Sequence, residues 1–186
     1  MNGKASMFNK KASDPKNKPD WVLDRLALQS GNFVADIGAG GGYFSLRFAE
    51  AVGKDGVVFA VDTNSGFLKF INERAKEKGL DNVETVLTSE DGASLPESVD
   101  LIFMRNVCHH IPNRVNYFIK LKKVLKENGR IAILEYRKAN GCTFRGLFRH
   151  YVPKKTIIKE MTQAGFQLEE DLEFLPEQSF TIFSIK

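Results

Sequence analysis

The fold is decided by Phe33-Val-Ala-Asp-Ile-Gly-Ala-Gly-Gly-Gly-Tyr-Phe44, a short apolar run followed by glycines. Its first five residues are apolar except for one acid, which predicts a buried strand in a parallel sheet. Gly38, Gly40 and Gly42 then permit a sharp turn and a close approach of the backbone to a ligand. A helix predicted to begin near Tyr43 would point its N–H groups at the same place. The stretch therefore predicts a ligand site at a strand–turn–helix junction.

The glycine spacing bears on the kind of ligand. A dinucleotide fingerprint, G-x-G-x-x-G, needs a small third residue where this chain has Tyr43. Asp36 precedes the first glycine, where its charge would repel a pyrophosphate but would attract a positively charged group or hydroxyls. The pattern D-x-G-x-G-x-G therefore favours a cationic or zwitterionic ligand.

A second acid follows the next predicted strand. The uninterrupted apolar run Val57-Val-Phe-Ala-Val61 ends at Asp62. In nucleotide-binding α/β folds an acid at this position accepts hydrogen bonds from both ribose hydroxyls, which makes Asp62 a candidate ligand contact. The alternative is a simple Asp-Thr-Asn turn that caps the following helix. That turn would explain Asn64 and Ser65 but not the position of Asp62.

With these residues the sequence resembles the class I, Rossmann-like S-adenosylmethionine-dependent methyltransferases of the small-molecule type, over nearly the whole chain. The resemblance implies that Asp36 lies near the amino group of the cofactor's methionine part, and that the glycines leave room for its sugar and amino-acid parts. The alternative is a glycine-rich turn without a ligand. The cofactor-binding residues implied are Asp36, Gly38, Gly40, Gly42, Tyr43, Asp62, Thr63, Asp91, Gly92 and Arg105.

The loop Ser89-Glu-Asp-Gly-Ala-Ser-Leu-Pro96 resembles the acidic loop of this family. The resemblance implies that Asp91 accepts a hydrogen bond from the adenine amino group. It also implies that the backbone N–H of Gly92 contacts an adenine ring nitrogen. Glu90 takes the role of Asp91 if the register shifts by one residue. The alternative is an acidic loop that is simply exposed to solvent.

The loop after the fourth predicted strand, Arg105-Asn-Val-Cys-His-His110, is expected to face the transferable methyl group, because ligands of open α/β sheets bind outside the carboxyl ends of the strands. A neutral imidazole of His109 or His110 could accept a proton from a hydroxyl or an amine, so both are candidate catalytic bases. The alternative is that the tandem histidines only shape the pocket. Glu135 and Tyr136, at the end of the fifth strand, are candidates for the pocket wall.

The remaining pattern predicts the rest of an α/β domain. Residues 1–18 show no clear periodicity and are expected to form a loop or arm over the cofactor, and the aromatic, basic segment 138–152 is expected to be the substrate lid. Trp21 and Ile119 are among the residues expected to face the core. With the resemblance, this predicts a three-layer α/β sandwich with a seven-stranded, mostly parallel sheet of order 3-2-1-4-5-7-6 and an antiparallel last strand. Periodicity predicts helices over 19–28, 43–52, 65–78, 111–126 and 153–165, and strands over 83–87, 99–104, 130–136, 166–174 and 180–185.

Length and composition bound the class of protein. With 186 residues, of which 42% are hydrophobic and 27% charged, a single globular domain over 1–186 is expected. No apolar run reaches the ~18–20 residues of a membrane span and the N-terminus has no signal-peptide core, so a cytoplasmic location is expected. Cys108 and Cys142 have no metal-ligand spacing, so we expect reduced thiols and no bound metal.

Three functions are compatible with the sequence. The resemblance implies methyl transfer from S-adenosyl-L-methionine to a small-molecule acceptor by in-line displacement, which mainly requires that the reactants be aligned. Residues 137–155 carry six Lys/Arg and no acid, which suits an RNA methyltransferase. A cofactor-binding module without activity is the third possibility. The acceptor, the methylated atom and the oligomeric state stay open.

Overall fold

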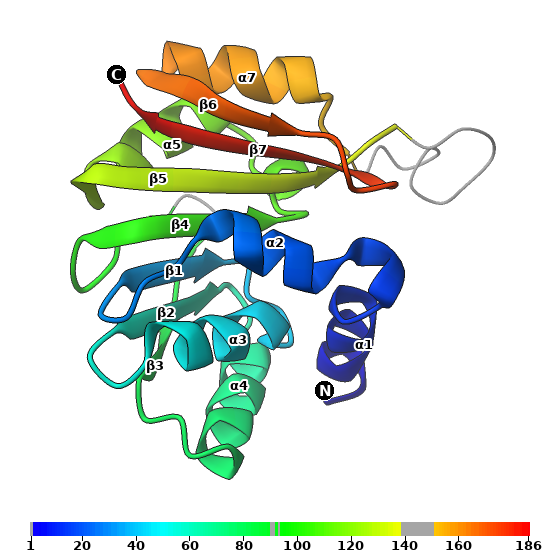
Figure 1. Cartoon of the computed structure of the whole chain (residues 1–186), viewed down its shortest axis with the longest axis vertical. Coiled ribbons are helices and arrows are strands. Elements are labelled where there is room, and N and C mark those ends of the chain that lie inside the picture. Colours follow the sequence, from blue (N-terminus) through cyan, green and yellow to red (C-terminus); the bar gives the residue numbers. More distant parts are fainter. Residues whose placement is uncertain (1, 90–91, 93, 139–150) are drawn as a thin grey trace.

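Seven strands form a mixed sheet in the order β3-β2-β1-β4-β5-β7-β6 (Figure 1). The computed structural model describes residues 2–89, 92, 94–138 and 151–186. β1 to β5 are parallel, and β7 runs antiparallel to both β5 and β6. The predicted α/β class, strand order and antiparallel last strand are confirmed. The strands are β1 (Phe33–Ile37), β2 (Val57–Asp62), β3 (Val83–Leu87), β4 (Val99–Arg105), β5 (Leu125–Tyr136), β6 (Phe166–Leu172) and β7 (Gln178–Ile185).

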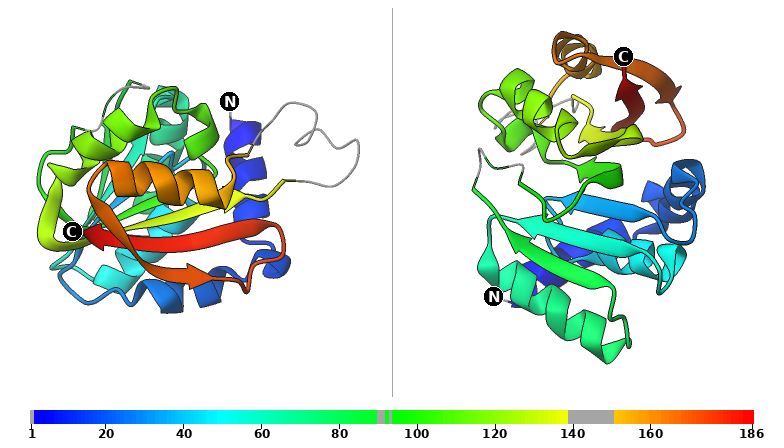
Figure 2. Two further views of the ribbon diagram at one scale, coloured as in Figure 1. Left: turned by 90° about the horizontal axis from the view of Figure 1, so that it is seen from above. Right: turned by 90° about the vertical axis from the view of Figure 1, so that its left-hand side faces the viewer.

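Helices cover both faces of the sheet (Figure 2) and complete the predicted three layers. α2, α3 and α4 form a first group that packs on one face of the sheet, and α5 and α7 form a second group on the other face. α1 lies beside α3 and α4, on the side toward which the parallel strands point (Figure 1). Short 3-10 turns follow α1 and β4. The first group is α2 (Pro19–Leu26), α3 (Tyr43–Val52) and α4 (Ser65–Glu77), the second is α5 (Arg114–Lys122) and α7 (Lys154–Gln163), and the others are α1 (Asn2–Ala12), η1 (Pro15–Asn17) and η2 (Cys108–His110).

The strands are buried on both faces, which explains their uninterrupted apolar sequences. On β1, Val34 packs in the cluster under α2 and α3, whereas its neighbour Ala35 packs in the cluster under α5 and α7. The ring centroid of Phe103 on β4 lies 4.9 Å from that of Phe44 and 5.1 Å from that of Phe48, both on α3. These contacts fix α3, and with it the preceding glycine turn, against the sheet.

The N-terminal segment was expected to be a loop or arm without regular structure, but residues 2–12 form helix α1. Its apolar residues Ala5 and Ala12 are buried, and the ring of Phe8 packs edge-on against that of Phe67 on α4, with 5.6 Å between centroids. On the next helix, Trp21 was expected to face the core but is 58% exposed. Its ring contacts Phe174 instead of entering the core.

The predicted helix over 111–126 is too long at both ends. Asn113 caps α5 by accepting a hydrogen bond from the Asn116 N–H at 3.2 Å, and the helix ends at Lys122. β5 then begins at Leu125, inside the range predicted as helix, and continues through Gly129 to Tyr136. The reason is that Leu125 is buried and pairs with Val99 on β4, with a shift of register after this pair. Ile119, expected to face the core, is 41% exposed.

Candidate functional site

The residues expected to bind ligand lie at one edge of the sheet, which we call the carboxyl edge. It is formed by the carboxyl ends of β1, β2, β4 and β5 and by the turns that follow them. β2 and β4 flank β1 on opposite sides, so the chain reverses its winding direction at β1. A reversal of this kind opens a crevice outside the strand ends, which is where α/β sheets bind ligands.

The glycine turn after β1 needs its glycines for both conformation and space. Gly38 and Gly42 have φ values of +73° and +78°, a region that other residues rarely adopt. A Cβ atom at Gly38 would lie 2.4 Å from Val107 Cγ2, and one at Gly42 would lie 2.6 Å from Ile71 Cγ1. The turn is therefore held between the loop after β4 and helix α4.

Asp36 lies beneath this turn and is 3% exposed. The Ser45 hydroxyl donates a hydrogen bond of 2.6 Å to its Oδ2. The pKa of Asp36 is raised to about 6, chiefly by burial and to a smaller extent by the charge of Asp62, although hydrogen bonds from Ser45 and the charge of Arg105 act in the opposite direction. The site thus contains a carboxyl group that the fold alone does not hold fully ionised at neutral pH.

Asp62 ends β2 on the other side of the turn and is 9% exposed. Its Oδ2 accepts a hydrogen bond from the Gly40 N–H and its Oδ1 accepts one from the Asn64 N–H, both at 2.9 Å. Each carboxylate oxygen can accept a second bond, so two hydroxyls could still be bound. Asn64 caps α4 by accepting hydrogen bonds from the N–H groups of Gly66 and Phe67. The Asp-Thr-Asn turn therefore caps the helix as well as presenting Asp62. Thr63 beside it is exposed.

Helix α1 covers the glycine turn through Asn9, a residue that the sequence analysis missed. Asn9 Oδ1 accepts from the Tyr43 N–H at 3.1 Å, and Asn9 Nδ2 donates to Gly41 O at 2.7 Å. The first N–H group of α3, which was expected to point at a ligand, is therefore already bonded. The signal in the sequence is the spacing i, i+3, i+4, i+7 of residues on the inward side of α1, which are Ala5, Phe8, Asn9 and Ala12.

Asn9→Ala should reduce the free energy of unfolding by about 0.5–2 kcal/mol, the range measured when an N-cap side chain is truncated. The reason is that Tyr43 N–H and Gly41 O both lose their partner. Urea unfolding measures the change. Lys10→Ala, on the exposed side of the same helix, is the matched control. Equal losses in the two variants would mean that only the helix propensity of α1 matters.

Arg105 ends β4 beneath the ring of Phe44, with the guanidinium carbon 5.8 Å from the ring centroid. Burial lowers the pKa of Arg105, while nearby Tyr136, Asp36 and Tyr43 raise it. Within the described part of the chain it forms no ion pair. A cation without an ionic partner at this edge is suited to bind a carboxylate.

The two candidate bases occupy different environments. The His109 side chain is 7% exposed, and its Nδ1 lies 2.9 Å from Oε1 of Glu135, which is 0% exposed. His110 is exposed, and its ring centroid lies 4.1 Å from that of His109. The adjacent Cys108 is fully buried, and this burial raises the pKa of its thiol well above the usual value, so it is no candidate nucleophile.

Some expected residues lie outside the described part of the chain. These are Asp91, its alternative Glu90, and residues 139–150 of the proposed lid. Gly92 is described, and its N–H donates to Ser89 O at 2.9 Å. Across the described ranges, no group of three or more His, Cys, Asp or Glu side chains is arranged to hold a metal ion. In the same ranges, no helix has the length and apolarity needed to span a membrane.

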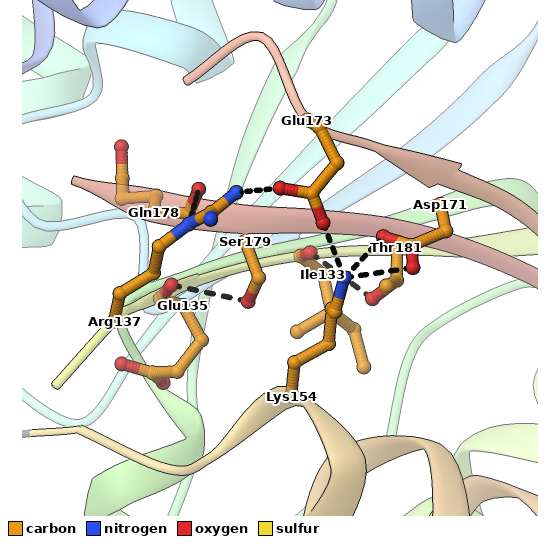
Figure 3. Close-up of polar contacts among 9 residues, drawn as sticks. All are labelled: Ile133, Glu135, Arg137, Lys154, Asp171, Glu173, Gln178, Ser179 and Thr181. Atoms are coloured by element: carbon orange, nitrogen blue, oxygen red, sulfur yellow. Dashed lines mark hydrogen bonds and ion pairs between the residues drawn. The ribbon is translucent and has the colours of Figure 1, made fainter. Parts of the chain in front are cut away.

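Two cations of the basic stretch 137–155 are paired with acids from outside it (Figure 3). Glu173 forms ion pairs with both Arg137 and Lys154. Lys154 also contacts Asp171, with 2.7 Å between Nζ and Oδ2, and Arg137 Nε donates to Gln178 O at 3.0 Å. The Lys154 and Arg137 contacts lower the pKa of Glu173. The stretch therefore carries less uncompensated charge than its sequence indicates.

Comparison with known proteins agrees with this geometry. Residues 28–174 match the model of a family described as a methyltransferase domain. A solved structure described as a SAM-dependent methyltransferase from Aquifex aeolicus superposes with a TM-score of 0.85 and 25% identity, covering 97% of this chain and 98% of that one.

Curated relatives at similar identity are longer than this chain. The C-methyltransferase UbiE of ubiquinone/menaquinone biosynthesis from Hydrogenovibrio crunogenus is 25% identical over 164 residues, which are 84% of this chain and 65% of that protein. The demethylmenaquinone methyltransferase of Geobacillus kaustophilus is 26% identical over 70% of this chain and 56% of its own length. The chain thus spans less than two thirds of these relatives. The family model matches most of the chain, and the chain belongs to this methyltransferase-domain family.

Proposed function

We propose that the protein transfers a methyl group from S-adenosyl-L-methionine to a small-molecule acceptor. The observation that carries the proposal is the pair of carboxyl groups, Asp36 and Asp62, on either side of a glycine turn at the point where the sheet reverses its winding. Membership of a methyltransferase-domain family supports it, as does the likeness to a structure described as SAM-dependent.

The residues at the carboxyl edge fit this cofactor by their chemistry. Asp62 has acceptor capacity left for the two ribose hydroxyls after its two backbone bonds. Asp36, whose pKa is raised to about 6, gains its charge readily once a cationic ammonium group lies nearby. Arg105 would bind the methionine carboxylate. Tyr43, Thr63, Asp91 and Gly92 stay predicted contacts.

The chain's own part in the reaction is to align the acceptor and to take up a proton. When bound, S-adenosylmethionine supplies an electrophilic methyl group on a sulfonium, so no metal or covalent intermediate is required of the protein. His109, beside the buried Glu135, is the better placed proton acceptor, and His110 is the alternative. Segment 138–152 stays a predicted substrate lid, and a cytoplasmic location stays a prediction.

A small molecule is a better acceptor for this chain than RNA. Of the six cations in residues 137–155, Arg137 and Lys154 already form ion pairs with Glu173, which removes them from a phosphate-binding surface. The relative from Hydrogenovibrio is named for ubiquinone/menaquinone biosynthesis and the relative from Geobacillus for demethylmenaquinone, which supports a small acceptor for this chain as well. An acceptor of this class would bind at the carboxyl edge, close to the two histidines.

The test combines calorimetric binding of S-adenosylmethionine with a screen that follows tritiated methyl groups into a panel of small metabolites and into total RNA. We expect one cofactor site and label in small molecules. Cofactor binding without transfer to either panel would favour a binding module without activity. Label in RNA, with transfer that falls steeply as salt is raised, would favour the RNA methyltransferase.

A further inference from the structure

Glu135 is the most deeply buried acid at the carboxyl edge. It is the penultimate residue of β5 and is 0% exposed. Its Oε1 accepts a hydrogen bond from the Tyr136 N–H at 3.0 Å and lies 2.9 Å from His109 Nδ1. Its backbone carbonyl accepts from the Ser179 hydroxyl on β7 (Figure 3). Both its main chain and its side chain are therefore fixed in place.

The second carboxylate oxygen of Glu135 distinguishes the His109–Glu135 pair from an ordinary structural ion pair. Among the residues that the structure describes, Oε2 is the one buried side-chain nitrogen or oxygen atom without a hydrogen-bond partner. Burying a charged oxygen without a partner destabilises a fold, so a purely structural role would not favour glutamate here. The arrangement is typical of a functional site, where strain and unsatisfied groups accumulate.

The contact with Glu135 also fixes the proton of the imidazole. An ionised carboxylate only accepts hydrogen bonds, so with Glu135 ionised the 2.9 Å contact places the hydrogen on His109 Nδ1. In the neutral ring the lone pair is then on Nε2, the atom that can take up a further proton. Arg114 near this pair is already bonded to Glu160 through two nitrogens, so it does not compete for Glu135.

We propose that Glu135 is a positioning residue that holds His109 as the proton acceptor of methyl transfer, and that the acceptor substrate is nucleophilic through an atom bearing a proton, such as a hydroxyl or an amine. The inference rests on the proposed function. As the acceptor atom bonds to the methyl carbon, its own X–H bond breaks and the proton moves to His109 Nε2. The electron pair of the broken methyl–sulfur bond stays on sulfur.

The buried carboxylate favours this step because it stabilises the imidazolium that forms. Nδ1–H stays bonded to Oε1 throughout, and the new positive charge lies beside a negative charge in a region that excludes water. After product leaves, the imidazolium returns its proton to solvent. Neither residue needs to contact the methyl donor.

The first test reads the proton position without any reaction. The chain has three histidines, so their ring nitrogens can be assigned in a ¹⁵N-labelled protein with His110→Gln and His150→Gln. Long-range ¹H–¹⁵N spectra of the neutral rings should show His109 protonated at Nδ1. In Glu135→Met, which keeps the volume but not the acceptor, the signal should move toward the Nε2–H form. In Glu135→Gln, which keeps an acceptor oxygen, Nδ1–H should persist.

The second test is a double-variant cycle on turnover with the acceptor that the screen identifies. His109→Gln should lower kcat by on the order of 10²-fold or more, the usual contribution of a general base. Glu135→Met should lower kcat by ~10–10²-fold with little change in the affinity for S-adenosylmethionine. The double variant should be no slower than His109→Gln alone, because the two residues act as one unit.

The matched control is Asp100→Asn, which weakens the partly buried ion pair with Lys126 and the bond from the Phe33 N–H at the opposite end of the sheet from His109. It should lower stability but leave the His109 signal and kcat unchanged. A His109 ring protonated at Nε2 in the native protein, or additive losses in the double variant, would overturn the positioning role. The expected spectra without methyl transfer to any acceptor would instead contradict the proposed function.

Discussion

Replacing Asp36 by Asn is expected to make the protein more stable at neutral and alkaline pH, by about 2 kcal/mol. The fold raises the pKa of Asp36 from 3.8 to about 6, chiefly by burial. The folded state therefore holds this proton more tightly than the unfolded chain, and the difference corresponds to about 3 kcal/mol at ~1.4 kcal/mol per pKa unit. An Asn side chain is uncharged and avoids this cost. Because it also weakens the hydrogen bond from Ser45 by about 1 kcal/mol, the net gain in stability is about 2 kcal/mol.

The sign of the pH dependence follows from the same shift. Because the pKa is raised in the folded state, ionisation of Asp36 removes stability as the pH rises from about 4 to about 6, and the loss is complete above that range. Urea unfolding at pH ~8 should show the gain in Asp36→Asn, and at pH ~4 the gain should disappear. The exposed Asp55→Asn is the control, with little change at either pH. An Asn variant that is less stable at both values would contradict the assigned cause.

Retention of a destabilising carboxyl group is understandable if a ligand uses it. A cationic group near Asp36 would lower its pKa and recover the free energy that the ligand-free fold loses. The Asn variant should then bind S-adenosylmethionine more weakly although it is more stable. Opposite effects on stability and on binding are typical of residues kept for function.

Asp62→Ala should weaken S-adenosylmethionine binding by ~10–150-fold, which corresponds to about 1.5–3 kcal/mol for charge-assisted hydrogen bonds to the ribose. The same change removes the acceptors of the Gly40 and Asn64 N–H groups, so a loss of stability is also expected. Calorimetry and urea unfolding must therefore be measured together.

Asn64→Ala separates the two effects of the Asp62 change. Asn64 caps α4 through Gly66 and Phe67 but offers no carboxylate to a ligand. This variant should lose about 0.5–2 kcal/mol of stability while its affinity for the cofactor changes little. If Asp62→Ala binds as tightly as Asn64→Ala, the ribose assignment is wrong and Asp62 only supports the turn.

The elements predicted best are those whose signals are local. α3 begins at Tyr43 and ends at Val52 as expected, because a glycine turn precedes it and Gly53 follows with φ +65°. β3 also has its predicted bounds, and the strand order follows from the resemblance. α5 was predicted too long because Leu125 fits an apolar helix face as well as a strand. Only its pairing with Val99 decides between them.

The site was predicted less completely, since its remaining features depend on contacts between distant segments. Asn9 is a polar residue in a basic, weakly amphipathic segment. Its spacing from Ala5 and Phe8 places it on the inward side of a helix, but that spacing does not identify its hydrogen-bond partners, Gly41 and Tyr43. His109 and His110 are neighbours with identical side chains. The contact between His109 and Glu135 on β5 gives the two histidines different surroundings. The place at which Glu135 is buried beside His109 depends on the register of β4 against β5, and no local sequence pattern specifies that register.

The reversed direction of β7 affects how binding to this protein should be measured. Because β7 runs against β5, residue 186 lies at the opposite end of the sheet from the carboxyl edge, whereas α1 lies at that edge (Figure 1). Attachment to a biosensor surface through the C-terminal end would leave the glycine turn facing the solution. Attachment through the N-terminal end would pull on the helix that supplies Asn9, and the measured affinity would then report on the linkage as well as on the ligand.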